Sequence, residues 1–164
     1  MELVWDSEFG GGFLTPTRVH CIVATDVSTE EIYVYHNGPD DWGRVGDVAA
    51  GVERLRSAST LICHNQVAID LHVLRHLFGF EYKGAVIDTL ILSRLLNPDR
   101  PRPYGMKGKA GPHSLESWAY RLGNQIEKVQ HEDWETFDEN MLRRCINDVR
   151  INLNVYRTLL KEAQ

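Results

Sequence analysis

The chain has 164 residues, 43% of them hydrophobic and 25% charged, and its formal net charge is -5. These values predict one globular domain, residues 1–164, with a full core, and they argue against a protein that coats nucleic acid nonspecifically. No apolar run approaches the roughly 20 residues of a membrane span and the start lacks a secretion signal, so we expect a cytoplasmic protein that does not act at a membrane.

Three strands are predicted first. Leu3-Val4-Trp5 is a short apolar run that ends at Asp6-Ser7-Glu8, before the flexible glycines at 10–12. Residues 18–26 and 31–35 are β-rich runs separated by a polar turn. Strands this close together in the chain pair as hairpins, so we expect an antiparallel start to a sheet.

Helices and strands alternate after that. Gly79 is expected to end one helix, and Asp88 or Thr89 to cap the next. The predicted fold is therefore α/β, with a mixed five-stranded sheet that is antiparallel at first and then parallel, flanked by helices. The expected elements are helices at 48–55, 69–77 and 90–96 and strands at 59–63 and 83–87.

Residues 97–112 interrupt this pattern with four of the six prolines and three glycines. A loop of this length is either functional or disordered. Two interpretations remain open, a solvated surface loop and a clamp on the phosphates of a nucleic acid. The loop carries four basic side chains: Arg100, Arg102, Lys107 and Lys109.

Two more helices complete the chain. Residues 113–122, closed by Gly123, form an amphipathic pattern whose Trp118 we expect in the core. The last helix is predicted over 137–161. Asp148 lies beside its buried stripe, where a carboxylate is costly unless it is paired or binds a cation.

Four acidic residues form the candidate site. Asp6 and Glu8 are two residues apart, so on a strand they project from the same face. Asp70 lies near the start of the helix after His64-Asn65, and Asp148 lies in the last helix. Hard divalent cations prefer carboxylate oxygens, and these groups could hold two metals about 4 Å apart. That arrangement serves phosphodiester hydrolysis, so we expect release of nucleotides.

Three motifs carry a resemblance to a known family. They are Asp6-Ser7-Glu8, the run HNQVAID from His64 to Asp70, and the run CIND from Cys145 to Asp148. Over nearly its whole length the chain resembles the DEDD, or DnaQ-like, 3′-to-5′ exonucleases of the RNase H-like fold. It looks most like the proofreading exonuclease domain of phage and bacterial family-A DNA polymerases. Segments 87–90 and 113–123 are similar to stretches between those motifs in the phage polymerases.

The resemblance implies two Mg²⁺ or Mn²⁺ ions as cofactors. Asp6 and Asp148 are expected to bind the tighter ion together with Glu8, and Asp6 is expected to reach the second ion as well. Asp70 is expected to act on the second ion through water. Asp88 is expected to cap a helix or support the ligands rather than bind metal.

The resemblance also assigns residues to the substrate. Asn65, next to His64, is expected to hydrogen-bond near the terminal nucleotide, and the backbone from Ser7 to Phe9 to contact the 3′ end. The implied activity is that of a stand-alone 3′-to-5′ exonuclease that releases nucleoside monophosphates from single-stranded or frayed DNA, with RNA left open. Its partners would be 3′ ends and a separate polymerase or replication protein, in the host cytoplasm if the protein is phage-encoded.

One departure from the family concerns the attacking water. The family carries a tyrosine four residues before the last aspartate, or a histidine five before it, to orient or deprotonate that water. Here those places hold Arg144 and Arg143. An arginine stays protonated and cannot be a general base. Arg144 is four residues before Asp148, close enough on a helix for an ion pair that competes with a metal.

Three interpretations of this departure stay open. Arg144 binds the scissile phosphate and leaves water activation to the metals, or a base comes from elsewhere, or hydrolysis is weak and the protein is a nucleic-acid-binding or polymerase-accessory subunit. A hydrolase of free nucleotides that uses the same carboxylates is a further rival. The candidate bases are His131, His113 and Tyr104.

Overall fold

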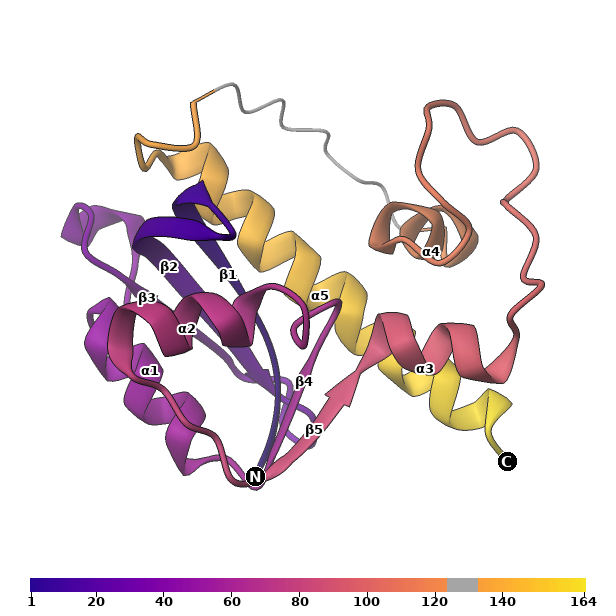
Figure 1. The fold of residues 1–164 in the computed structure, drawn as a ribbon, viewed down its shortest axis with the longest axis horizontal. Coiled ribbons are helices and arrows are strands. Elements are labelled where there is room, and N and C mark those ends of the chain that lie inside the picture. The colour runs from indigo at the N-terminus through magenta and orange to yellow at the C-terminus, as the bar shows by residue number, and fades with distance from the viewer. Residues whose placement is uncertain (124–132) are drawn as a thin grey trace.

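A computed structural model describes residues 1–123 and 133–164 (Figure 1). A five-stranded sheet with the strand order β3-β2-β1-β4-β5 forms its centre. β1 pairs antiparallel with β2 and parallel with β4, which confirms the predicted mixed sheet. The strands are β1 (Glu2–Gly12), β2 (Thr15–Asp26), β3 (Ile32–His36), β4 (Thr60–Cys63) and β5 (Ala85–Asp88).

Helices cover both faces of the sheet. Helices α1 and α2 pack on one face, and the long helix α5 crosses the other (Figure 1). None of the described helices is both long and apolar enough to cross a lipid bilayer. The helices are α1 (Val48–Ser57), α2 (Asp70–Phe78), α3 (Thr89–Leu96), α4 (Leu115–Arg121) and α5 (Glu139–Glu162), with a 3₁₀ turn at Asp40–Trp42.

Alternation along β1 divides the core between the two faces. Leu3 and Trp5 are buried in the cluster under α1 and α2. Val4 is buried in the cluster under α5, together with Val149. The even-numbered face of β1 is therefore the face that meets α5, and polar residues that continue it lie next to that helix.

β1 is longer than predicted. Its expected end at Asp6-Ser7-Glu8 is wrong, because pairing with β2 continues to Gly12, with register shifts after Glu8 and after Gly10. The glycines at 10–12 indicated a loop, yet the partner strand holds them in the ladder. Asp6 and Glu8 thus lie inside a paired strand rather than on a loose end.

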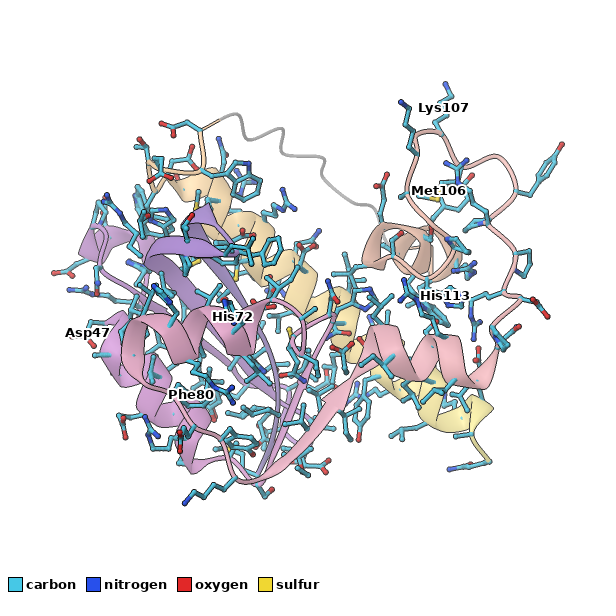
Figure 2. The ribbon with its side chains drawn as sticks, viewed as in Figure 1. Asp47, His72, Phe80, Met106, Lys107 and His113 are labelled. Carbon is cyan, nitrogen blue, oxygen red and sulfur yellow. The ribbon has the colours of Figure 1, made fainter. Side chains whose placement is uncertain are left out.

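A third cluster joins α4 to α3 and α5. Trp118 is buried there as predicted, against Ile151 and Val155 of α5. The proline-rich loop at 97–112 lies over α4, where Met106 is buried and the neighbouring Lys107 points outward (Figure 2). This loop is therefore packed against the domain through its inner side chains.

Candidate active site

The site lies where β1 and β4 separate. The two strands pair only through Glu2–Val4 and Thr60–Ile62, and their following residues diverge. β1 has β2 on one side and β4 on the other, so the chain changes direction in the sheet at this point. Crevices at the carboxyl ends of strands at such a switch point are the usual ligand sites of open α/β sheets.

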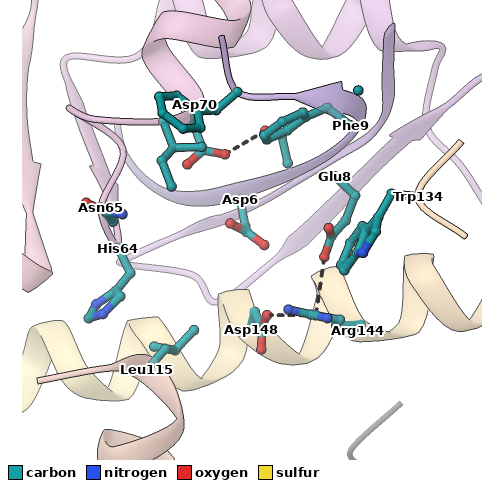
Figure 3. A pocket seen from close by; sticks show the side chains of 14 residues that line it. Asp6, Glu8, Phe9, His64, Asn65, Asp70, Leu115, Trp134, Arg144 and Asp148 are labelled. Atoms are coloured by element: carbon teal, nitrogen blue, oxygen red, sulfur yellow. Dashed lines mark hydrogen bonds and ion pairs between the residues drawn. The ribbon is translucent and has the colours of Figure 1, made fainter. Parts of the chain in front are cut away.

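A cavity of about 560 Å³ opens at this point (Figure 3). Its lining brings together most residues that the sequence singled out. Nine of them line it: Asp6, Ser7, Glu8, Phe9, His64, Asn65, Asp70, Arg144 and Asp148.

The four carboxylates converge in this cavity from three elements. One carboxylate oxygen each from Asp6, Glu8 and Asp148 lie within 4.8 Å of one another. An oxygen of Asp6 also lies within 4.8 Å of an oxygen of Asp70 and of the Cys63 sulfur. Asp6 therefore belongs to both groups and is the central carboxylate of the site.

Asp70 is held in place by hydrogen bonds from two strands. The Ser7 hydroxyl donates to Asp70 Oδ1 at 2.7 Å, and the Cys63 thiol donates more weakly to Asp70 Oδ2 at 3.9 Å. Asp70 is also the first residue of α2, where a negative charge faces the positive end of the helix dipole. These contacts orient its carboxylate toward Asp6.

The turn before α2 presents Asn65 to the cavity. Asn65 has a φ of 71°, in the left-handed region that asparagine tolerates better than most residues. The Asp88 carboxylate accepts hydrogen bonds from the amides of Asn65 and Val67, at 3.0 and 3.1 Å. It also caps α3 by accepting from the amides of Leu90 and Ile91, which confirms the predicted cap.

Burial and mutual repulsion raise the pKa values of the carboxylates. Burial is the largest cause for Asp6, whose pKa lies well above its ordinary value, and the charges of Asp70, Glu8 and Asp148 add to it. Burial raises the pKa of Glu8 to about 8, although Arg144 opposes the shift. Burial raises the pKa values of Asp70 and Asp148 to about 6. The site therefore holds more negative charge than one arginine neutralises.

Without a divalent cation, the free energy of unfolding is expected to fall as the pH rises from about 4 to about 8. The pKa values of Glu8, Asp70 and Asp148 are higher in the folded chain than in the unfolded one, so the folded state binds more protons over this range. Each unit of difference corresponds to about 1.4 kcal/mol. Urea unfolding at pH 5, 6.5 and 8 in EDTA measures the slope. Glu8→Gln should flatten it, and a stability that rises with pH would contradict the prediction.

Arg144 faces the carboxylates. Its Nε lies 3.6 Å from Glu8 Oε1 and 3.7 Å from Asp148 Oδ2, so the contact predicted from the helical spacing to Asp148 is present. Its guanidinium lies 5.0 Å from the ring centre of Trp134, which also lines the cavity. Arg144 is therefore the counterion of this site in the described part of the chain.

The described candidate bases lie elsewhere. His113 is buried between Ser93 and Pro98, with Nδ1 2.8 Å from the serine hydroxyl. Tyr104 is fully exposed on the proline-rich loop. Neither lines the cavity of the carboxylates. His131 lies outside the described residues.

The basic loop is not brought to the carboxylates. Arg100, one of the candidates for a phosphate clamp, is buried: its guanidinium pairs with Glu162 at 3.1 and 2.5 Å and lies 4.4 Å from the ring centre of Trp118. Arg102 donates to the Gly108 carbonyl within the loop. None of the four basic residues of the loop, Arg100, Arg102, Lys107 and Lys109, lines the cavity.

Arg100→Leu is expected to lower the free energy of unfolding by about 2 kcal/mol, because it removes an ion pair and a cation–π contact together. Thermal and urea unfolding measure the loss. Lys109→Ala, on the exposed side of the same loop, should stay within about 0.5 kcal/mol of the wild type. A weakened affinity for oligonucleotides without loss of stability would instead favour the phosphate clamp.

Sequence reasoning missed Trp134. It lines the cavity with 37% of its surface exposed and packs against Arg144. A tryptophan in a polar segment just before the last helix was a usable signal, but its partner on α5 is ten residues away and on another element. Phe13 and Leu115 also line the cavity and were not assigned to it.

No protein-family model matches the chain. Among curated proteins, the chain is similar to the DNA-directed DNA polymerase of Escherichia phage T7, with 28% identity over 192 aligned residues, 98% of this chain and 27% of the polymerase. It is 26% identical to the polymerase of Enterobacteria phage T3, over 98% of this chain and 27% of that one. The chain thus spans about a quarter of the length of these relatives.

Solved structures share the fold. RNase D of Escherichia coli, an exoribonuclease involved in structured RNA processing, matches with a TM-score of 0.65 and 20% identity over 98% of this chain and 39% of its own. NrnC of Brucella melitensis matches with a TM-score of 0.66 and 21% identity over 98% of this chain and 72% of its own. NrnC has been solved with pGG and with Mg²⁺. These likenesses confirm the predicted RNase H-like fold.

Proposed function

We propose that the chain is a DnaQ-like 3′-to-5′ exonuclease that uses two divalent metal ions to release nucleoside monophosphates from single-stranded or frayed 3′ ends of DNA or RNA. Its similarity to the polymerases of phages T7 and T3 and the fold that it shares with RNase D support this proposal. One observation supports this proposal most strongly. Carboxylates from β1, α2 and α5 converge in one cavity, and Asp6 is close to the other three.

The donor set fits a hard divalent ion. The site offers carboxylate oxygens, which Mg²⁺ and Mn²⁺ prefer as ligands. The pKa values of Asp6 and Glu8 are raised by burial and by repulsion between the carboxylates, and a bound cation would stabilise their charged forms against both effects. We assign one ion to Asp6, Glu8 and Asp148, and a second to Asp6 and Asp70. The Mg²⁺ in NrnC, a protein of the same fold, supports this choice of metal.

The proposed reaction is hydrolysis of the last phosphodiester bond. A water oxygen attacks the phosphorus, the bond to the 3′ oxygen of the penultimate nucleotide breaks, and that oxygen takes up a proton. Bound metals would activate the water and stabilise the leaving oxygen. Asn65 and the backbone from Ser7 to Phe9 line the same cavity and would orient the terminal nucleotide. The products are a nucleoside 5′-monophosphate and a shortened strand.

Arg144 is assigned to the scissile phosphate. Its guanidinium stays protonated, and its planar set of N–H donors suits phosphate oxygens. It lies beside Glu8 and Asp148, where the reacting phosphate must approach the carboxylates. A substrate phosphate would give the guanidinium a new partner once cations neutralise those two carboxylates.

The same contacts favour a second candidate function. If Arg144 keeps its place on Glu8 and Asp148, it competes with the metal. The protein would then bind 3′ ends with little hydrolysis, as an accessory subunit of a separate polymerase or replication protein.

Degradation of 5′-labelled single-stranded DNA and RNA in Mg²⁺ or Mn²⁺ distinguishes the two functions. A ladder that shortens from the 3′ end supports the exonuclease, and the faster strand identifies the preferred nucleic acid. An intact label on a bound strand, with cleavage restored by Arg144→Tyr, supports the accessory subunit. Hydrolysis of free nucleotides with intact oligonucleotides would overturn both.

A further inference from the structure

A bulge in the β1–β2 hairpin places His20 out of register. Glu8 pairs with Cys21 and Phe9 with Val19, so His20 is the extra residue that the bulge inserts into β2. Bulges of this kind turn a side chain in a new direction and recur beside active sites. His20 is only 4% exposed, and a buried imidazole needs a hydrogen-bond partner.

His20 finds that partner in the segment 133–137, more than a hundred residues away in the chain. Its Nε2 lies 2.9 Å from the carbonyl oxygen of Trp134, so the ring donates to this carbonyl. The ring also stacks on Phe137, with 5.7 Å between the ring centres and 5° between the planes. The segment is thus held on both sides of residue 135.

A second anchor comes from Glu135. Its Oε1 accepts a hydrogen bond from the Gly11 amide at 2.7 Å. A side chain at Gly10 would oppose this contact, because its Cβ would lie 3.2 Å from Glu135 Oε2 and 2.9 Å from the Thr17 hydroxyl. The end of the hairpin is therefore shaped to receive the segment.

The anchored segment carries Trp134, which packs against Arg144 at 5.0 Å. Arg144 is 39% exposed and has a long side chain, so it can adopt many rotamers unless a neighbour restricts them. Such a side chain needs an external support to stay over Glu8 and Asp148.

We propose that His20 is a positioning residue that fixes Trp134 and thereby keeps Arg144 at the carboxylates. This inference rests on the proposed function for the step in which Arg144 contacts the scissile phosphate. The bulge that turns His20 toward Trp134 is thus linked, through Trp134, to the position of the Arg144 side chain.

A double-mutant cycle tests the inference. His20→Leu removes the donor, His20→Gln keeps an N–H that can reach the same carbonyl, and each is combined with Arg144→Leu. In the wild-type background, His20→Leu should lower kcat on a single-stranded oligonucleotide by about tenfold with little change in KM, and His20→Gln should restore most of it. In the Arg144→Leu background, His20→Leu should have no further effect. Equal effects in both backgrounds would overturn the proposal.

Affinity for Mn²⁺, measured by electron paramagnetic resonance, gives a readout that does not depend on nuclease activity. Arg144→Leu should tighten Mn²⁺ binding because it removes a cation that competes with the metal. His20→Leu should also tighten Mn²⁺ binding, and the double variant should bind Mn²⁺ no more tightly than Arg144→Leu alone. If wild-type protein fails to cleave, the proposed function fails, and the Mn²⁺ cycle still decides the positioning role. If His20→Leu does not fold, Glu135→Ala takes its place in both cycles, because it removes the second anchor of the segment by a change at an exposed residue. Glu139→Ala, at another exposed glutamate, is the control for that variant.

Discussion

Asp6→Asn is expected to lower hydrolysis at 3′ ends by on the order of 10³-fold or more. Asp6 contributes to both groups of ligand atoms, one with Glu8 and Asp148 and the other with Asp70. Asparagine keeps the size of the side chain but loses the negative charge, so it weakens both proposed metal positions at once. Among the described residues, no other carboxylate belongs to both groups.

The fold of the Asp6→Asn protein should survive. The pKa of Asp6 is raised by burial and by its acidic neighbours, so replacing it by a neutral side chain removes repulsion and should leave the melting temperature equal or higher without metal. Gel analysis of a labelled oligonucleotide measures the activity, and calorimetry the stability. Asp99→Asn, on the exposed loop, is the matched control and should cleave like the wild type. A variant at Asp6 that kept a tenth of the activity would exclude a central role.

Gln66→Leu is expected to lower the free energy of unfolding by about 3 kcal/mol or more. Gln66 is fully buried, and its side-chain oxygen accepts from the Trp5 indole at 2.9 Å. Its side-chain nitrogen donates to the carbonyls of Leu61 and Ile87, at 3.2 and 2.8 Å. Leucine would leave one donor and two acceptors without their partner in the interior, and each such loss costs about 1–3 kcal/mol.

Urea unfolding of Gln66→Leu, with circular dichroism as the signal, measures this loss. Gln164→Leu at the exposed end of the chain is the control and should lie within about 0.5 kcal/mol of the wild type. Because Gln66 joins β1, β4 and β5 beneath the turn of Asn65, the variant should also cleave more slowly at temperatures where it remains folded. Unchanged stability would mean that water or a neighbouring group satisfies the three partners.

Local patterns predicted the elements well and their long-range partners poorly. The period-2 and helical spacings predicted the sheet and its helices, and the four-residue spacing from Arg144 to Asp148 predicted their contact. The length of β1 was missed because the glycines at 10–12 favour a loop when read alone. Their pairing with β2 is decided by the neighbouring strand, which local propensity does not include.

The contacts that support the site could not be predicted either, because they join residues that are far apart in the chain. His20 and Trp134 are 114 residues apart, and Arg100 and Glu162 are 62 apart. In a proline-rich basic loop, nothing local distinguishes Arg100, which packs on Trp118, from Lys109, which is exposed. The convergence of the carboxylates was predicted from the two-residue spacing of Asp6 and Glu8 and from the places of Asp70 and Asp148 in predicted helices, and the resemblance then supported it. The catalytic roles of these carboxylates remain predictions for the experiments above.

One strand carries both the centre of the core and the centre of the site. Leu3, Val4 and Trp5 are fully buried, and Asp6 and Glu8 follow in the same hydrogen-bonded ladder. Backbone amides of this stretch should therefore exchange with deuterium only when the whole domain opens. Heat inactivation and global unfolding should then follow one curve, so a preparation that has lost its activity on warming has lost its tertiary structure as well.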